Sequence, residues 1–473
     1  MPNDEIEGMI PCQVQEPDGQ EIAGVLRLRN GMCRSGLTLV IGLVLMLSLS
    51  LFITMYVTGG VRARSADKTS DLRNSITFED SKPTSIGSLI EITSHAKPGQ
   101  KLVIPPGVHL SGKQRIHGLH GSTDNWIMIE AYDVVIDGNL QVSDCTYLML
   151  TGIEVKNSDG HGIRAGNVCN LTLYQVKVHH HRENGMQLSG KGLKVDHSEV
   201  HHVALRNTGG GKAFGWPQCI GTWKMRNGSP SEDVTITNNL VHHCWGEGID
   251  VLWADRALVA NNYIWDVYSA NVYVDASNRV TVEKNYIRNV DPAYKNTEKQ
   301  LAKAFVVGAE SGRKTTRVYI RNNIVATANM CLNTYAQGKA VITVQFYRNT
   351  CWGTWANSPL WVKVSGGTNK VTNNIFVEGA KGQEGGFDGG SAGWRIRQNV
   401  WARRKVNAPA YWDKKAWGSR GIRKRNPRVF FKWGPNCDAE PKPMCFALKK
   451  RWSRAGALHP PDYKPDGWPL KHK

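Results

Sequence analysis

The sequence predicts an all-β solenoid, a fold in which short coils of chain stack on one another. The evidence is a repeated unit rich in Val and Ile that ends on an Asn, with its clearest copies at residues 234–241, 258–264, 280–287 and 318–325. With three weaker copies, the shared Asn residues are Asn239, Asn262, Asn285, Asn323, Asn349, Asn374 and Asn399. They are 23, 23, 38, 26, 25 and 25 residues apart. Periods in this range are typical of repeat architectures.

Each unit has the composition of short strands. Apolar residues alternate with polar ones, which is the period of a half-buried strand. About ten residues after each Asn comes a second short strand, as at residues 248–252, 271–275 and 305–308. A coil of this size fits one turn of a parallel β-helix, and the leucine spacing of the rival leucine-rich repeat is absent. We therefore expect the Asn side chains to stack at an inward turn and to bond the coils above and below.

The same register continues upstream, where Ile153, Val176 and Ser198 take the place of the Asn. Here the sequence resembles the right-handed parallel β-helix superfamily, which includes pectate lyases, polygalacturonases, alginate and chondroitin lyases and mannuronan epimerases. The resemblance covers roughly residues 97–457 and includes the opening segment 98–107. It implies the fold more firmly than any one chemistry. His161 lies in a Gly-His-Gly similar to that of polygalacturonases, but the paired-Asp and Arg-x-Lys motifs are missing, so that activity is not carried over.

The chain divides into five predicted segments. They are a disordered tail at 1–36, a transmembrane signal-anchor at 37–58, a linker and cap start at 59–96, the β-helix at 97–400 and a basic, Trp-rich cap or tail at 401–473. The stretch from Leu37 to Val57 carries no charge and is long enough to span a bilayer. Ala63-Arg-Ser65 is a poor cleavage site, so we expect a retained single-pass anchor rather than a removed signal. The β-helix is then extracytoplasmic.

The positive charge is concentrated at the carboxyl end. The formal net charge is +19, and residues 401–473 hold 19 Lys and Arg against 5 Asp and Glu, a difference of +14. Such a tail suits an acidic polysaccharide or an anionic lipid or wall polymer, or it is a solvated cap. A membrane anchor argues against nucleic acid. We predict a polysaccharide partner, expected to be acidic, and a monomer.

Cysteines are numerous but form no metal motif. Of the ten Cys, eight follow the predicted anchor, and an even number in an exported domain permits disulfides. Cys437 and Cys445 would close a short loop and are the expected pair. The cysteines of the coils are expected to be buried as small apolar residues. No CxxC spacing occurs, so a structural zinc site is not predicted.

Two segments break the period and mark a candidate cleft. They are residues 204–232 and residues 291–303, the second expected to be helical from Thr297 to Ala304. Insertions in a solenoid form loops that wall a binding face. On that face the register points four side chains outward, namely Arg164, Gln187, Asp250 and Tyr273.

Carboxylates on this face are the candidate chemical groups. Asp275 lies two residues beyond Tyr273, which puts the Asp250 and Asp275 backbones about 8 Å apart. The catalytic candidates are Asp250, Asp275, Glu247 and Lys224. The substrate-binding candidates are Arg164, Gln187, Trp223, Arg226, Trp253 and Tyr273.

Three interpretations of this face remain open. Two carboxyls at such a separation suit an inverting glycoside hydrolase. Alternatively, Asp250, Asp255 and Asp275 could hold Ca²⁺ that neutralises a uronate before Lys or Arg abstracts a proton, as in a lyase. No cofactor is certain. The third interpretation is a non-catalytic glycan-binding or surface-structure protein whose outward Asp residues are simply solvated.

Histidines recur at one position of the repeat. His179–His180–His181, His201–His202 and His242–His243 all follow the first strand of their coils. Stacked one coil apart, they would either form a turn ladder of rings or bind a transition metal.

Overall fold

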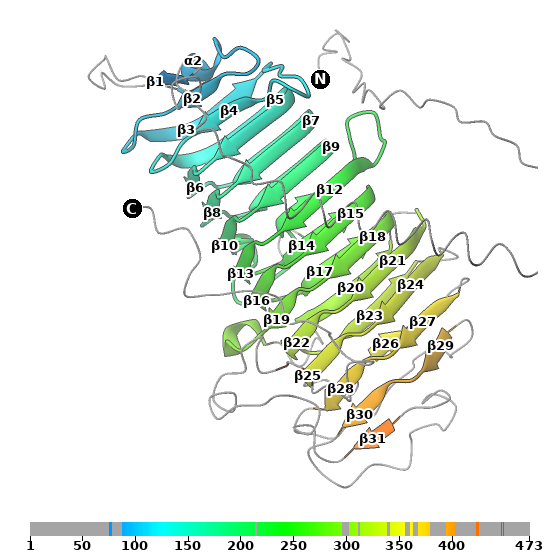
Figure 1. Ribbon diagram of the computed structural model, residues 1–473. Helices are drawn as coiled ribbons and strands as arrows, with labels where there is room; N and C mark the ends of the chain where they lie inside the picture. Colours follow the sequence, from blue (N-terminus) through cyan, green and yellow to red (C-terminus); the bar gives the residue numbers. More distant parts are fainter. Residues whose placement is uncertain are drawn as a thin grey trace, which may run out of the picture. The chain divides into compact units, whose positions relative to one another are not determined.

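The protein is a parallel β-helix in the computed structural model, which describes residues 75–77, 88–212, 215–295, 302–310, 313–337, 341–354, 360–362, 368–378, 394–402, 422–424, 446 and 448. Every strand pairing in these residues is parallel, and each strand bonds its counterparts in the coils before and after it (Figure 1). The predicted fold is confirmed.

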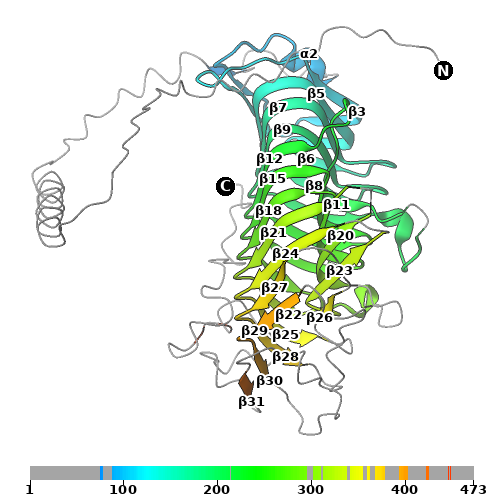
Figure 2. The same ribbon diagram turned by 90° about the vertical axis from the view of Figure 1, so that its right-hand side faces the viewer.

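Three columns of strands run along the stack, and Figure 2 shows them from the side. Sheet 1 contains β3 (His109–His117), β5 (Val135–Thr151), β7 (Ile163–Tyr174), β9 (Met186–Asp196), β11 (Gln218–Thr222), β14 (Glu247–Leu252), β17 (Ala270–Asp275), β20 (Lys303–Ala309), β23 (Leu332–Ala336) and β26 (Leu360–Val362). The long strands β5, β7 and β9 bend from sheet 1 into sheet 2 without a break.

Sheets 2 and 3 complete each coil. Sheet 2 continues with β1 (Ser75–Thr77), β2 (Lys101–Val103), β4 (Ile127–Glu130), β12 (Ser231–Thr237), β15 (Ala254–Ala260), β18 (Asn278–Glu283), β21 (Thr315–Arg321), β24 (Ile342–Tyr347), β27 (Asn369–Thr372) and β29 (Trp394–Arg397). Sheet 3 contains β6 (Glu154–Lys156), β8 (Lys177–His179), β10 (Glu199–Val203), β13 (Leu240–Cys244), β16 (Tyr263–Val267), β19 (Tyr286–Arg288), β22 (Ile324–Thr327), β25 (Thr350–Thr354), β28 (Ile375–Glu378), β30 (Val400–Ala402) and β31 (Ile422–Lys424). The short helices are α2 (Leu89–Thr93), η2 (Leu205–Asn207) and η3 (Pro292–Tyr294).

The core is a stack of inward apolar columns. In sheet 1, Met186, Ile220, Ile249, Val272 and Phe305 occupy one column, and each is at most 1% exposed. Residues on either side of each member face outward, since side chains alternate along a strand. Asp250 and Tyr273, which follow Ile249 and Val272, therefore face outward, as the register predicted.

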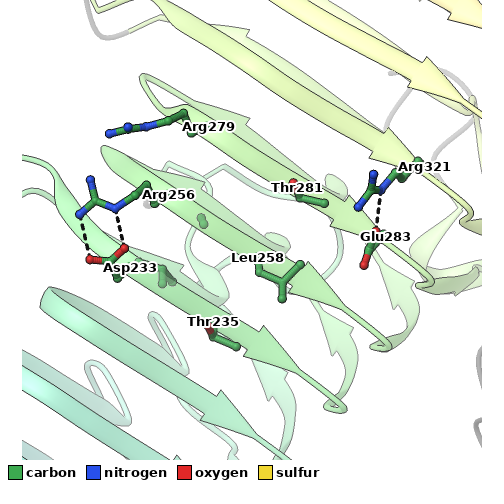
Figure 3. Close-up of a pocket in the computed structure, with 10 residues that line it drawn as sticks. Asp233, Thr235, Arg256, Leu258, Arg279, Thr281, Glu283 and Arg321 are labelled. Carbon is green, nitrogen blue, oxygen red and sulfur yellow. Dashed lines mark hydrogen bonds and ion pairs between the residues drawn. The ribbon is translucent and has the colours of Figure 1, made fainter. Parts of the chain in front are cut away.

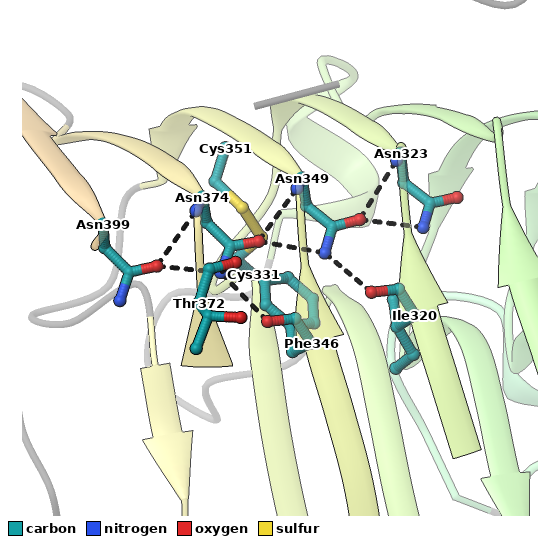
Figure 4. The surroundings of a disulfide bond; sticks show 9 residues. All are labelled: Ile320, Asn323, Cys331, Phe346, Asn349, Cys351, Thr372, Asn374 and Asn399. Atoms are coloured by element: carbon teal, nitrogen blue, oxygen red, sulfur yellow. Dashed lines mark hydrogen bonds between the residues drawn. A yellow bond between two sulfur atoms is a disulfide. The ribbon is translucent and has the colours of Figure 1, made fainter. Parts of the chain in front are cut away.

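An Asn ladder fixes the turn between sheets 2 and 3. From Asn239 to Asn374, each amide Nδ2 donates to the Oδ1 of the next Asn at 3.0–3.1 Å (Figure 4, for its last members). Upstream, Ser198 takes over, because its N–H donates to Asn239 Oδ1 and its hydroxyl accepts the Val176 N–H. The predicted ladder and its upstream register are both confirmed.

The coil cysteines are not all simple buried thiols. Cys219 pairs with Cys244 and Cys331 pairs with Cys351, each bond joining coils one repeat apart (Figure 4, for the second). The expectation of ordinary burial is wrong for these four, since the turns bring them within about 6 Å at their Cα atoms. The expected Cys437–Cys445 pair lies outside the described residues.

The predicted boundaries need adjustment where the coils are irregular. Residues 204–232 are not a single insertion, because β11 lies inside them and pairs with β9 and β14. Lys303 and Ala304 begin strand β20 rather than end a helix. Strands also extend beyond residues 97–400, with β1 before and β31 after that range. The segment from Leu37 to Val57 lies outside the described residues, among which no helix is long and apolar enough to cross a membrane.

Candidate active site

The outer face of sheet 1 brings the predicted site residues together. Strand pairing places Arg164 opposite Gln187, Gln187 opposite Gly221, Gly221 opposite Asp250, and Asp250 opposite Tyr273. This column is the one that the register predicted, with Gly221 of the unrecognised strand β11 added. Arg164 is exposed and Gln187 half-buried, so both are accessible beside the more deeply buried residues that follow.

An acid cluster, made of Glu247, Asp250, Asp275 and Glu310, lies at the centre of this face. Glu247, Asp250 and Asp275 are only 5%, 2% and 3% exposed. The Glu247 and Asp250 carboxyls hydrogen-bond to each other, and the Glu310 N–H donates to Asp275 Oδ1 at 2.9 Å. The Tyr273 hydroxyl donates to the Glu310 carboxylate. Leu252 is opposite Asp275, so the Asp250 and Asp275 backbones lie about 8 Å apart as predicted.

Burial decides the protonation of the cluster. It raises the pKa of Glu247 to about 8, although hydrogen bonds from Asp250 and Gln218 oppose the shift. Burial and then the charge of Glu247 raise the pKa of Asp250 well above its usual range. The pair therefore retains a proton at neutral pH. Burial also raises the pKa of Tyr273, so its hydroxyl keeps its proton and remains a hydrogen-bond donor. Burial lowers the pKa of Lys303, although the negative charges of Glu247 and Glu310 act to raise it.

Two oxygens in this region lack hydrogen-bond partners among the described residues. They are Asp250 Oδ1 and Asn271 Oδ1, both buried. Asn271 is itself fixed, since its Nδ2 donates to the Lys303 carbonyl at 2.9 Å. Buried acceptors without partners are costly unless a ligand supplies donors, and sugar hydroxyls are donors of the right kind.

A glycine makes room for the tyrosine of the cluster. A Cβ at Gly308 would lie 2.3 Å from the Tyr273 hydroxyl, so any other residue there would displace the ring. Tyr273 can reach Glu310 only because β20 has no side chain at Gly308. Gly308 is therefore part of the site's geometry.

An aromatic rim, made of Trp223 and Trp253, follows the ends of the neighbouring strands β11 and β14. The Trp253 ring carries two cations, with Lys224 Nζ at 5.5 Å and the Arg313 guanidinium at 5.7 Å from its centroid. Trp223 is 40% exposed. Arg226 is exposed two residues beyond Lys224. Lys224 thus contacts an aromatic ring, and no described contact joins it to the acid cluster.

The predicted Ca²⁺ ligand Asp255 does not join the cluster. It lies on β15 in sheet 2, where it accepts hydrogen bonds from Arg279 and Asn278, each at 2.9 Å. The Arg279 guanidinium lowers its pKa. In the described part of the chain, only His201, His202 and His242 bring three metal-binding atoms of His, Cys, Asp or Glu within 4.8 Å of one another. A Ca²⁺ site of Asp250, Asp255 and Asp275 therefore does not fit, because the chain turns to another sheet at Trp253.

Several site residues were not found from the sequence. Glu310 lies within the repeat step of 38 residues from Asn285 to Asn323, which hides its position beside Asp275. Lys303, Asn271 and Arg313 carry no repeat signal of their own. Gln218 belongs to β11, which begins 20 residues after Ser198 instead of about ten.

Sheet 2 carries a separate groove of about 360 Å³ (Figure 3). Its charged side chains are mutually paired. Arg256 binds Asp233 at 2.8 Å, and Arg321 binds Glu283 at 2.6 Å. Because arginines already bind the carboxylates Asp233 and Glu283 of this groove, neither is available for proton transfer. The acid cluster on sheet 1 is therefore the better candidate for a catalytic site.

Comparison with family models supports the fold. The family model described as a right handed beta helix region matches residues 224–351. Among solved structures, an alginate lyase from Paenibacillus sp. str. FPU-7 is 16% identical, with 54% of this chain and 90% of that one covered and a TM-score of 0.43. The PL6 family alginate lyase AlyGC is 14% identical, with 78% and 56% covered and a TM-score of 0.48, so this chain spans little more than half of it. Pectate lyase Pel9A is 14% identical, with 77% and 84% covered and a TM-score of 0.40. A search of curated proteins finds no match.

Proposed function

We propose that this protein is a membrane-anchored, extracytoplasmic carbohydrate enzyme that cleaves glycosidic bonds of a polysaccharide on the outer face of sheet 1. The observation that carries the proposal is the burial of Glu247 and Asp250 against each other beside Asp275, which raises the pKa of both carboxyls of the pair. A departing glycosidic oxygen must be protonated, and this requires a carboxyl that keeps its proton near neutral pH.

The cluster divides into an acid and a base. The Glu247–Asp250 pair donates its proton to the leaving oxygen. Asp275, held by the Glu310 N–H, accepts a proton from the attacking water. With backbones about 8 Å apart, the two Asp side chains can hold their carboxyls at the roughly 6.5–9.5 Å that leaves room for this water in inverting enzymes. The C–O bond breaks as the water oxygen bonds to the anomeric carbon, so the proposal predicts inversion.

The surroundings support a polysaccharide that carries acidic sugars. Trp223 offers an open ring for stacking on a sugar. Lys224, Arg226 and Arg313 supply positive charge around the rim and would attract uronates to neighbouring subsites. The acid cluster itself is negative, which disfavours a uronate carboxylate directly over it and favours hydrolysis over lyase chemistry there.

The test is an assay of the full-length chain on a panel of uronic-acid and neutral polysaccharides, with and without Ca²⁺. We expect new reducing ends without the absorbance of unsaturated uronates. Asp250→Asn and Asp275→Asn should each lower the rate by at least about 100-fold, the usual size of general acid–base effects. Glu283→Gln is the matched control, because it removes an outward carboxyl from sheet 2.

Other results would change the assignment. Unsaturated products would mean a lyase. If the formation of unsaturated products required Ca²⁺, the site would have to include a bound metal ion. No product on any polymer, together with salt-sensitive retention on an acidic glycan, would make the protein a glycan-binding one.

A further inference from the structure

Six histidines form a two-column ladder on the outside of sheet 3, where β8, β10 and β13 follow one another (Figure 1). The histidine ladder consists of His179, His201 and His242 in one column and His180, His202 and His243 in the other. Neighbouring rings within a column lie 4.7–5.0 Å apart and within 4° of parallel. Trp265 stacks on His242 at 3.9 Å and ends the first column.

The two columns meet through their Nδ1 atoms. The Nδ1–Nδ1 distance is 2.6 Å for His179 and His180, 2.7 Å for His201 and His202, and 2.6 Å for His242 and His243. Two ring nitrogens this close share one proton, because two N–H groups would repel each other. Each pair therefore holds a lone pair that points at its neighbour rather than at solvent.

In two of the three pairs a carboxylate fixes which nitrogen carries that lone pair. Glu199 lies 3.2 Å from His242 Nε2, and Glu154 lies 3.0 Å from His179 Nε2. An imidazole that donates from Nε2 has its free lone pair at Nδ1. Histidines that bind metal ions are commonly oriented in this way, with the other ring N–H given to a carboxylate.

We propose that His201, His202 and His242 bind a divalent transition-metal ion. One ring nitrogen from each lies within 4.8 Å of the other two. Nitrogens bonded at about 2.0–2.1 Å to one tetrahedral ion lie about 3.4 Å apart, so binding requires the rings to approach by up to about 1.4 Å and to tilt out of the parallel stack. When His201 and His202 both bind through Nδ1, the proton that they share moves to the Nε2 of the ring that carried it, which conserves the proton count.

The donor set decides the class of ion. Three imidazole nitrogens with no direct carboxylate suit Zn²⁺, Ni²⁺ or Cu²⁺, whereas Ca²⁺ and Mg²⁺ prefer oxygen. The ladder is on sheet 3 and the acid cluster is on sheet 1, so binding here is independent of the proposed catalysis. An ion shared by His201 and His242 would join two successive coils, and its affinity should appear as added stability.

The test is titration of the untagged full-length protein with Zn²⁺ and with Ni²⁺ by calorimetry, together with thermal unfolding. We expect one ion per chain and a higher unfolding midpoint. His201→Phe combined with His242→Phe keeps stacked rings in a column that already accepts Trp265, and should weaken binding at least 100-fold. Glu199→Gln should weaken binding about 10–100-fold by releasing the His242 ring. His117→Ala, an exposed histidine outside the ladder, is the matched control.

Three results would overturn the proposal. They are no saturable binding of either ion, undiminished affinity in a folded double-Phe variant, and equal weakening by His117→Ala. If the double-Phe variant fails to fold, Glu199→Gln and His202→Asn decide the question, and unchanged affinity in both would reject the site.

Discussion

Glu247 and Asp250 lie on the same strand, β14, and their carboxyls hydrogen-bond to each other although neither is more than 5% exposed. Ionising both of two adjacent buried carboxyls is unfavourable, because each charge is desolvated and repels the other, so the pair retains a proton. Asp275 and Glu310 add negative charge nearby and strengthen that effect. The pair makes β14 the centre of the proposed catalytic site.

Asp250→Asn should separate activity from stability. The amide keeps the shape of the carboxyl but cannot donate the catalytic proton, so we expect the rate of glycosidic cleavage to fall at least about 100-fold. The free energy of unfolding should stay about equal, because the amide can still donate a hydrogen bond to Glu247 and adds no charge to the cluster. Urea unfolding and reducing-end assays measure the two quantities. A loss of activity matched by a large loss of stability would indicate a structural role instead.

Glu247 should give stability a distinctive pH dependence. Its pKa is raised from 4.5 to about 8 on folding, so the folded protein binds more protons than the unfolded chain between these values. The stabilisation from protonated Glu247 is fully present below 4.5 and is lost as pH rises to about 8. The buried histidines act in the opposite sense, since burial lowers the pKa of His201 from 6.5 to about 2.

Comparison with the Glu247→Gln variant separates the contribution of this carboxyl to the pH dependence of stability from the contribution of the histidines. The difference in unfolding free energy between wild type and variant should fall with rising pH and become flat above about 8. Urea unfolding at a series of pH values gives this difference directly. Parallel curves for the two proteins would show that Glu247 ionises normally.

Asn285→Ala should be strongly destabilising. Its Oδ1 accepts the N–H and the Nδ2 of Asn262, and its own Nδ2 donates to Asn323 Oδ1 and to the Val259 carbonyl. Buried groups left without partners cost about 1–3 kcal/mol each, so we expect a loss of about 2–5 kcal/mol. Asn227→Ala, in an exposed loop, should change stability by less than about 0.5 kcal/mol. A similar small effect at Asn285 would mean that the ladder follows the fold rather than supports it.

The disulfide between Cys219 and Cys244 should stabilise the coils that carry the site. It joins residues 25 apart in sequence, and closing a loop of that length is worth about 3–4 kcal/mol. Replacing both cysteines by Ala should therefore lower the free energy of unfolding in urea by about that amount. Cys145→Ala removes a buried thiol without a bond and should cost less, about 1 kcal/mol.

The sequence was sufficient for the fold because the repeat signal is local. Alternating apolar residues and the Asn that ends each strand are read within one coil, and they correctly placed Asp250 beside Tyr273. Strand β11 was missed because a Gly-rich segment displaces it, so that Ile220 lies 22 residues after Ser198, whereas Ile249 lies ten after Asn239. Glu310 was missed because a step of 38 residues separates Asn285 from Asn323 and obscures which residues are neighbours.

The chemistry of the site depends on features that no repeat encodes. Asp255 is only five residues from Asp250, yet the left-handed conformation of Trp253, with φ of 52°, turns the chain into sheet 2 between them. The shared proton of Glu247 and Asp250 depends on burial, which the chain packed around β14 provides. Likewise, the cysteine pairs depend on how the turns align successive coils.

Trp223→Ala should weaken substrate binding and leave the chemical step intact. Trp223 follows β11 and is 40% exposed, so its ring can stack on a sugar beside the acid cluster rather than over it. Stacking of this kind contributes about 0.5–1.5 kcal/mol beyond burial, so we expect KM to rise about 3- to 10-fold with little change in kcat. Met128→Ala removes a comparably exposed apolar side chain from sheet 2 and should alter neither constant. A fall in kcat at constant KM would instead place Trp223 against the reacting bond, because only an interaction made in the transition state has that signature.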